Sequence, residues 1–233
     1  MMMAQFQMPN LGGIGQVAGN GSGLGVGLDS TQIASGLKQA LSVGTENAVK
    51  AVGQPGGYLS SPTIAIPLPK DLQMVAQIAR DAGQGAKVDA FVASMNHAAE
   101  SAAPAAGPIF ADAVKNMSIG DARQLLNGGN TSITDYFKAK TSDQLAAAFR
   151  PHVVDAMKTN GVAEQYQALM SRAPNVSSFL GSLGGGGSNF DINTYVVNEA
   201  LNGLFIMLGQ QEKQIRTNPA ARSTALLQKV FGK

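Results

Sequence analysis

The clearest candidate for chemistry in this sequence is a histidine and a glutamate three residues apart, His97 and Glu100. Residues at this spacing share one side of a helix, so the imidazole and the carboxylate can meet there. Such a pair can act as general acid and base, or supply two ligands to a metal ion. A closed metal site needs three or four ligands, and the sequence has neither an HExxH motif nor a second histidine nearby. An ordinary pair on a helix surface is therefore favoured over catalysis.

Other patterns with chemical potential are weaker. No G-x-S-x-G sequence is present, and a serine-based triad would have to recruit His97 or His152, the two histidines of the chain. The glycine pairs near the N-terminus lack the Lys-Ser/Thr of a phosphate-binding loop. The stretch from Asp191 starts like a calcium loop but has no glycine at its sixth position and no glutamate at its twelfth. We predict no catalytic residue, no metal site and no cofactor.

Two sets of residues are candidates for binding a ligand or a partner. Residues 210–233 carry five basic residues and one acid, so this helical sequence could contact anionic lipid, a polyanionic glycan or an acidic partner. The alternative is that these basic side chains form an ordinary solvated face and partly compensate the dipole at helix ends. The second set follows a double-glycine loop and consists of an aromatic residue and a lysine. These two side chains could bind a ligand, or the aromatic ring could instead pack in the core. The candidates are Tyr136, Lys140, Lys213, Arg216 and Arg222.

The composition limits the classes of function. The chain has 233 residues, 44% hydrophobic and 14% charged, with a net charge of +2. This near-neutral balance gives no reason to expect a nucleic-acid partner. The absence of cysteine excludes disulfides, thiolate zinc sites and cysteine nucleophiles. No apolar run reaches the 18 to 20 residues or so of a spanning helix, and no secretory signal opens the chain. Both a cytoplasmic protein and a mature exported chain fit these features.

The elements that would position these side chains are helices. Apolar residues recur at helical spacing, and Asp29, the set Ser118–Asp121 and the set Ser132–Asp135 have the spacing of helix caps. We expect a separate helix from Ser142, with a kink at Pro151. The predicted helices cover about residues 29–53, 70–82, 86–103, 109–117, 119–127, 132–141, 142–160, 162–172, 192–216 and 218–233. We therefore expect about nine helices and no sheet.

Three segments are not predicted to be helical. Residues 58–69 contain three prolines and are expected to form an extended strap. Residues 173–189 are rich in glycine and serine and are expected to form a flexible loop. Residues 1–28 carry no charge, and glycines recur every four residues at Gly15, Gly19, Gly23 and Gly27. A flexible leader is the favoured interpretation of that pattern, and ordering on assembly is the alternative.

Several strings of the sequence resemble a known family. They are GLKQAL at 36–41, IAIPLP at 64–69, FVASMNHAAESAAPAAGPIFADAVKNMS at 91–118, DARQLLNGG at 121–129, DYFKAKT at 135–141 and YVVNEALNGLFIMLGQQEKQIRTNPAARSTALLQKVFG at 195–232. In this order they resemble the bacterial helical family called domain of unknown function 4197, over about residues 29–233. Its members are typically exported, so the resemblance implies a periplasmic or outer-membrane-associated location. Residues 4–5 would then be the mature start. The family usually has arginine at the position of His97, which argues against an essential role for this histidine.

The sequence therefore predicts an all-α protein with one compact domain over 29–233 and a leader over 1–28. The first hypothesis is a non-enzymatic cell-envelope protein that acts by binding or by self-assembly into a homo-oligomer, with the leader as tether or assembly segment. A carrier of a hydrophobic ligand or lipid, with methionines lining its pocket, is the first alternative. A hydrolase that uses His97 and Glu100 is the second. The location could also be cytoplasmic.

Overall fold

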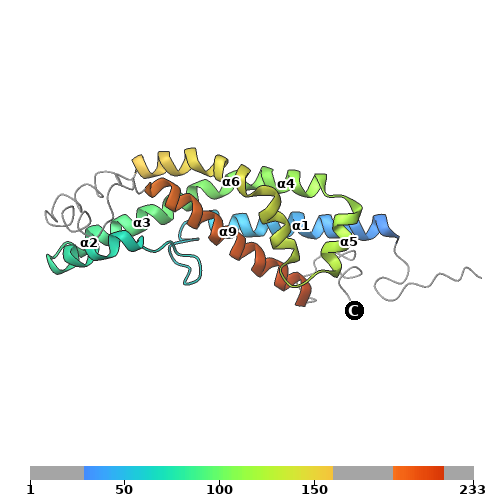
Figure 1. Cartoon of the computed structure of the whole chain (residues 1–233), viewed down its shortest axis with the longest axis horizontal. Helices are drawn as coiled ribbons and strands as arrows, with labels where there is room; N and C mark the ends of the chain where they lie inside the picture. Colours follow the sequence, from blue (N-terminus) through green and yellow to red (C-terminus); the bar gives the residue numbers. More distant parts are fainter. Residues whose placement is uncertain (1–28, 160–190, 218–233) are drawn as a thin grey trace, which may run out of the picture.

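The computed structural model describes residues 29–159 and 191–217, and in these ranges the regular structure is entirely helical. Figure 1 shows an elongated arrangement of the helices. In chain order they are α1 (Ser30–Gly53), α2 (Lys70–Asp81), α3 (Gly85–Ala102), the 3₁₀ turn η1 (Ala103–Ala105), α4 (Ala106–Asn116), α5 (Ile119–Asn127), α6 (Ser132–Thr159) and α9 (Ile192–Thr217). The all-α prediction is confirmed, although the described ranges hold fewer helices than the nine or so expected. The leader, the 162–172 helix, the 173–189 loop and the 218–233 helix lie outside the described residues.

The core forms where α6 and α9 pack together. α6 also packs on α3 and α4, while α1 packs on α9, α4 and α5. Phe110 of α4 meets Phe137 of α6 edge to face, with ring centroids 5.3 Å apart, and Phe205 of α9 at 6.4 Å. Burying each such side chain contributes about 1.5–3 kcal/mol. No helix in the described ranges is long and apolar enough to cross a bilayer.

Helix α6 is a single helix, so the prediction of two helices divided at Ser142 is wrong. Its buried residues recur every four positions from Ile133 to Met157, which keeps one face on the core throughout. The hydroxyls of Thr141 and Ser142 donate to the carbonyls one turn earlier, at 2.6 Å each, and so do not cap a new helix. Pro151 lies on the exposed side, and the helix continues through it.

Two predicted caps are confirmed. The Asp29 carboxylate accepts the backbone N–H groups of Thr31 and Gln32 at 2.8 Å each, and the Gln32 side chain accepts the Asp29 N–H. At the start of α5, Ser118 and Asp121 form the reciprocal capping box that their spacing predicts. These bonds satisfy N–H groups that a helix cannot pair internally.

The strap at 58–69 is only partly extended. Residues 58–60 and 62–64 form turns, in which the Ser60 N–H donates to the Gly56 carbonyl and the Ala65 N–H to the Ser61 carbonyl, both at 3.0 Å, so the prediction of an extended segment is wrong there and fits only residues 65–69. No strand forms in the described ranges. The buried Asn96 amide holds the strap by accepting the Ile66 N–H at 2.8 Å and donating to the Ile66 carbonyl at 3.0 Å. The buried Tyr58 hydroxyl donates to the Ala200 carbonyl of α9 at 2.6 Å. The strap is therefore tied to α3 and α9 by side chains instead of by a β-ladder.

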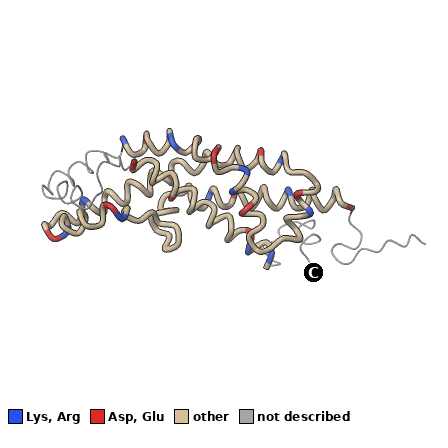
Figure 2. Tube along the Cα trace, in the orientation of Figure 1, with Lys and Arg blue, Asp and Glu red and all other residues tan. Residues whose placement is uncertain are grey.

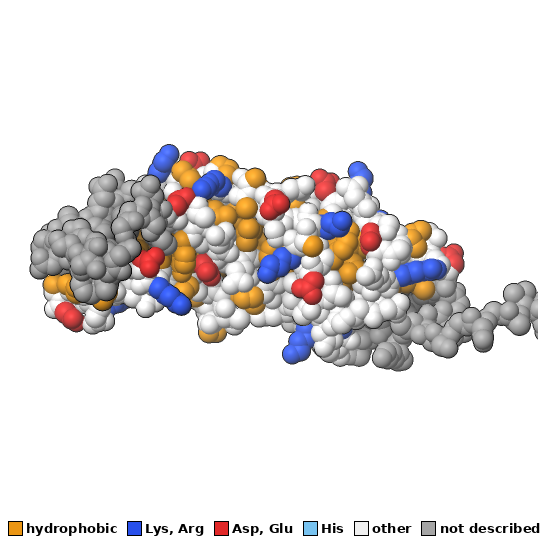
Figure 3. Space-filling view, in the orientation of Figure 1, with side chains coloured by type: hydrophobic (Ala, Val, Ile, Leu, Met, Phe, Trp, Pro, Cys, Tyr) orange, Lys and Arg blue, Asp and Glu red, His pale blue; other side chains and the backbone are white. Residues whose placement is uncertain are grey.

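Several methionines of the described ranges belong to the core. Met95, Met117 and Met157 are buried, whereas Met74 of α2 is 53% exposed. α2 packs on α3 through Leu72 and Val75, so Met74 lies on its outer side. On the face shown in Figure 3, exposed hydrophobic side chains form separate small patches among polar atoms.

Candidate functional site

His97 and Glu100 do meet, but Glu100 does not lie on the surface as predicted. His97 Nδ1 is 2.9 Å from Glu100 Oε2, and the two side chains are 49% and 6% exposed. The other carboxylate oxygen, Oε1, accepts the N–H groups of Tyr58 and Leu59 at 3.1 and 3.2 Å. A buried carboxylate needs such donors to offset its lost hydration. The geometry gives Glu100 an anchoring role for the turn after α1.

No group of three or more potential metal-ligating side chains forms in the ranges that the structure describes. Along the described helices, Lys and Arg positions are interspersed with Asp and Glu positions (Figure 2). The glycine pattern at 15–27 and Arg222 lie outside the described residues, so the structure leaves those candidates as predictions.

Glu212 of α9 caps the start of α6, a role that the sequence analysis missed. Its buried carboxylate accepts the N–H groups of Ile133 and Thr134 at 3.1 and 2.9 Å, and the Thr134 hydroxyl at 2.8 Å. The predicted cap Ser132–Asp135 is wrong, because Asp135 pairs instead with the Thr131 hydroxyl at 3.0 Å. Local spacing could not show a cap from a residue almost eighty positions away.

The two basic candidates of α9 that the structure describes differ in environment. Lys213 is exposed, whereas the Arg216 side chain is only 12% exposed. Its guanidinium donates to Glu212 at 3.0 Å, to the Leu125 carbonyl at 2.9 Å and to the Ser132 hydroxyl at 2.9 Å. Arg216 therefore ties the end of α5, the start of α6 and α9 together.

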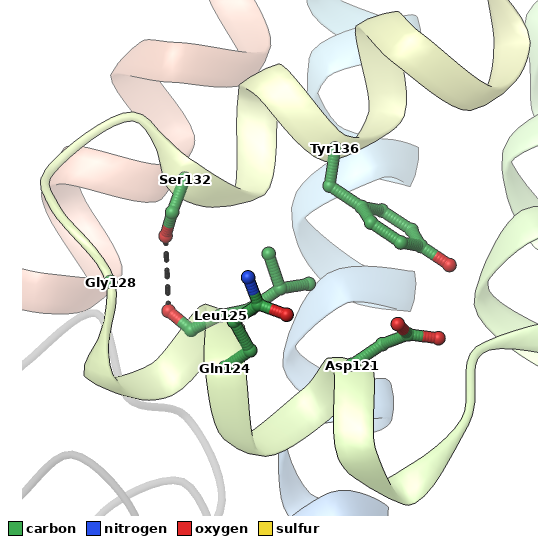
Figure 4. Close-up of a pocket in the computed structure, with 6 residues that line it drawn as sticks. All are labelled: Asp121, Gln124, Leu125, Gly128, Ser132 and Tyr136. Carbon is green, nitrogen blue, oxygen red and sulfur yellow. Dashed lines mark hydrogen bonds between the residues drawn. The ribbon is translucent and has the colours of Figure 1, made fainter.

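Tyr136 lines an open cavity of about 300 Å³ between α5 and α6, which we call the α5–α6 groove (Figure 4). Six residues line it: Asp121, Gln124, Leu125, Gly128, Ser132 and Tyr136. Figure 4 shows the first three approaching from α5 and the last two from α6, with the glycine in the turn between the helices. Of the sequence candidates, Tyr136 is in the lining, and Lys140 lies one helical turn beyond it on the exposed surface.

Close packing fixes the closed end of the groove. The Ser132 hydroxyl donates to the Leu125 carbonyl at 3.0 Å while accepting from Arg216 (dashed line to Leu125 in Figure 4). A Cβ atom at Gly128 would lie 2.6 Å from the Ser132 Cβ, so only glycine fits this turn without displacement. Gly128 of the double glycine is thus required by side-chain proximity, whereas a Cβ atom at Gly129 would meet nothing within 4 Å.

The groove carries a charged group and a neutral phenol. The Ser118 hydroxyl, followed by its backbone N–H, holds the pKa of Asp121 below its usual value, and the positive charge of Lys140 acts in the same direction. Burial raises the pKa of Tyr136, with a further contribution from the negative charge of Asp121. At neutral pH the groove therefore presents a carboxylate and a protonated hydroxyl.

Two polar groups of the groove are free to bind something else. Within the described part of the chain, neither the Gln124 amide nor the Tyr136 hydroxyl has a hydrogen-bond partner. The Leu125 side chain and the Tyr136 ring supply apolar surface beside them. An apolar surface with a few convergent polar groups is typical of a ligand site. A smaller cavity of about 200 Å³ lies between α1 and α9, and the residues that line it in the described ranges are all uncharged.

Comparison with known proteins adds a family. A family model described as "Protein of unknown function (DUF4197)" matches residues 27–232. The chain belongs to this family. No curated protein and no solved structure matches it. The resemblance found in the sequence is confirmed. Because the description of the DUF4197 family gives no reaction, the assignment of a role rests on the geometry above.

Proposed function

We propose that this protein is a non-enzymatic binding protein of the bacterial cell envelope and that the α5–α6 groove is its ligand site. The observation that carries the proposal is the convergence in one cavity of the Asp121 carboxylate, the Gln124 amide and the Tyr136 hydroxyl beside apolar surface. Elsewhere, the buried carboxylates of Glu100 and Glu212 accept backbone N–H groups, as structural anchors do. The 27–232 family match supports one domain over 29–233.

Direct binding tests the ligand site. In ¹⁵N-labelled full-length protein, free amino acids, dipeptides, monosaccharides and short-chain fatty acids are added one class at a time, and the Gly128 amide signal is followed. We expect one class to shift this signal in a saturable way. Gln124→Ala should weaken that binding at least fivefold, and Gln144→Ala, the same change at an exposed position of α6, should not. If no class shifts the Gly128 signal, the proposal is wrong.

The location is tested separately. The family resemblance supports export, and we expect the native protein to leave cells with the periplasmic fraction on osmotic shock, or to remain with outer membranes. Antibody detection beside cytoplasmic and periplasmic marker proteins measures this. Co-fractionation with the cytoplasmic marker would contradict the envelope location and leave the groove proposal intact.

A further inference from the structure

We propose that the α5–α6 groove selects a small amphoteric ligand, of the amino-acid or short-peptide class, with its ammonium group at Asp121 and its carboxylate group at Lys140. The inference rests on the proposed function, because it takes the groove to be the ligand site. What it adds is the chemical class of the ligand and the residue that recognises each end.

Asp121 supplies the negative end of the groove. Its Oδ2 atom accepts the Ser118 N–H at 3.1 Å and the Ser118 hydroxyl at 2.8 Å, which fixes the carboxylate in place. Its second oxygen, Oδ1, has no hydrogen-bond partner among the residues at 29–159 and 191–217. In Figure 4 this carboxylate and the Tyr136 hydroxyl end on the same side of the groove. A positioned carboxylate with a free oxygen is suited to a charge-assisted bond from an ammonium group.

Lys140 supplies the positive end. It lies one turn after Tyr136 on α6, is exposed, and is close enough to Asp121 to favour the ionised carboxylate. Lysine binds anions as a compact charge with three donors. No hydrogen bond or ion pair occupies its ammonium group within the described ranges. Its ammonium group is therefore available to the carboxylate of a ligand that extends from the groove past Tyr136.

The two opposite charges explain why an amphoteric ligand is favoured over a singly charged one. A simple cation at Asp121 would be repelled by Lys140, and a simple anion at Lys140 would be repelled by Asp121. A ligand with both charges meets an opposite charge at each end. Between them, the Gln124 amide can donate to and accept from a peptide group, and Leu125 offers contact to a small apolar side chain.

The volume of the groove agrees with a small ligand. About 300 Å³ is at the lower end of the range for ligand pockets. Extension beyond Ser132 is blocked, because this side chain bridges the Leu125 carbonyl and Arg216 at the closed end. These limits favour a single amino acid or a dipeptide over a long chain bound through its middle.

Three matched peptides test the inference. Alanyl-alanine carries both charges, its Nα-acetyl form has only the carboxylate, and its C-terminal amide has only the ammonium group. We expect alanyl-alanine to bind the full-length protein at least tenfold more tightly than either blocked form, measured by calorimetry and by the Gly128 amide shift. Asp121→Asn, which keeps an oxygen for the Ser118 bonds, should abolish the preference over the acetyl form, and Lys140→Ala the preference over the amide.

The control is Lys138→Ala, which removes an exposed lysine from another side of α6 and should change none of these affinities. Equal affinity for the three peptides would overturn the charge selection and leave the groove as a ligand site. Binding of a sugar or fatty acid at Gly128, with none of the peptides, would also overturn the inference but not the proposed function. No shift of Gly128 by any probe would overturn both.

Discussion

At the scale of single residues, two buried carboxylates stabilise the fold of this protein. Glu100 and Glu212 each accept two backbone N–H groups from a distant segment and pair with one cationic or imidazole side chain. Burying a carboxylate costs free energy. Removing it from the folded protein is also destabilising, because the buried N–H groups that bonded to it lose their acceptor. Glu100, half of the clearest candidate pair for chemistry in the sequence, therefore has a role in stability, and two variants test this.

Glu100→Ala should lower the free energy of unfolding by about 2–4 kcal/mol, because the Tyr58 and Leu59 N–H groups lose their acceptor. His97→Arg keeps a donor beside Glu100 and should stay within about 0.5 kcal/mol of the wild type, since His97 is half exposed. Urea unfolding followed by circular dichroism measures both. A loss below about 1 kcal/mol for Glu100→Ala would show that water replaces the carboxylate.

Tyr58 should make the protein sensitive to alkaline pH. Burial, and secondarily the charge of Glu100, raise the pKa of Tyr58. The unfolded chain, with a tyrosine pKa near 10, then releases this proton at lower pH than the folded chain does. Its contribution to stability is complete below about pH 10 and is lost as the pH rises above that value.

The matched variant is Tyr58→Phe. At pH 7 it should cost about 1 kcal/mol, because the hydroxyl bond to the Ala200 carbonyl is lost. Between about pH 10 and 11.5, its urea midpoint should fall less steeply than that of the wild type. Parallel falls of the two midpoints would show that Tyr58 does not carry the alkaline sensitivity.

Contacts from elsewhere in the chain fix the ends of several elements. α6 begins where Glu212 receives its first N–H groups, and Arg216 holds the neighbouring end of α5. The strap follows its path because Asn96 and Tyr58 bond it to α3 and α9. α9 is thus the element on which both the strap and the α5–α6 groove depend.

Arg216→Ala should destabilise the protein by about 3 kcal/mol, since it leaves the buried Glu212 without its counter-charge and removes one donor each from the Leu125 carbonyl and the Ser132 hydroxyl. Lys213→Ala is the control, because it removes an exposed cation from the same helix and should change stability by less than about 0.5 kcal/mol. Thermal and urea unfolding of both variants give the comparison. Equal effects would contradict the linking role of Arg216.

Two glycines of α9 should respond in opposite directions to alanine. At Gly203 a Cβ atom would lie 2.6 Å from a Tyr58 ring carbon and 3.2 Å from the Ile64 Cβ, so Gly203→Ala should cost about 1–3 kcal/mol. At Gly209 the nearest atom is 3.6 Å away, and Gly209→Ala should stabilise by up to about 1 kcal/mol through helix propensity. Unfolding midpoints measure both, and a stabilising Gly203→Ala would contradict the close contact of the strap.

At the scale of the whole molecule, the described helices form an elongated body (Figure 1), and the sequence before them, residues 1–28, carries no charge. We expect deletion of residues 1–28 to reduce self-association and membrane co-sedimentation, because glycines every four residues permit close packing between chains. Asp29 remains as the cap of α1, so the urea midpoint should not change. Light scattering after size exclusion measures the mass. Unchanged mass and sedimentation would show that the segment is only a tail.

Local chemistry made much of the fold predictable. The caps at Asp29 and Ser118 and most helix boundaries follow from side chains within a few residues, and the structure confirms them. The predicted division of α6 is wrong because Ser142 is of a residue type that often caps helices, whereas its hydroxyl donates to the Lys138 carbonyl within the same helix. Of the groove, only Tyr136 was expected in the lining, since its other lining residues come together only when α5 packs beside α6.

The sequence by itself determined the helical class, the family and the scarcity of groups for proton transfer, because periodicity, caps and residue types are local properties. The tertiary structure alone decided that Glu212 caps α6 and that the Arg216 guanidinium forms hydrogen bonds inside the protein. It also decided that Asp121, Gln124 and Tyr136 line the same cavity. Burial and pairing between residues far apart in the chain depend on how helices pack, and no short stretch of sequence encodes that geometry.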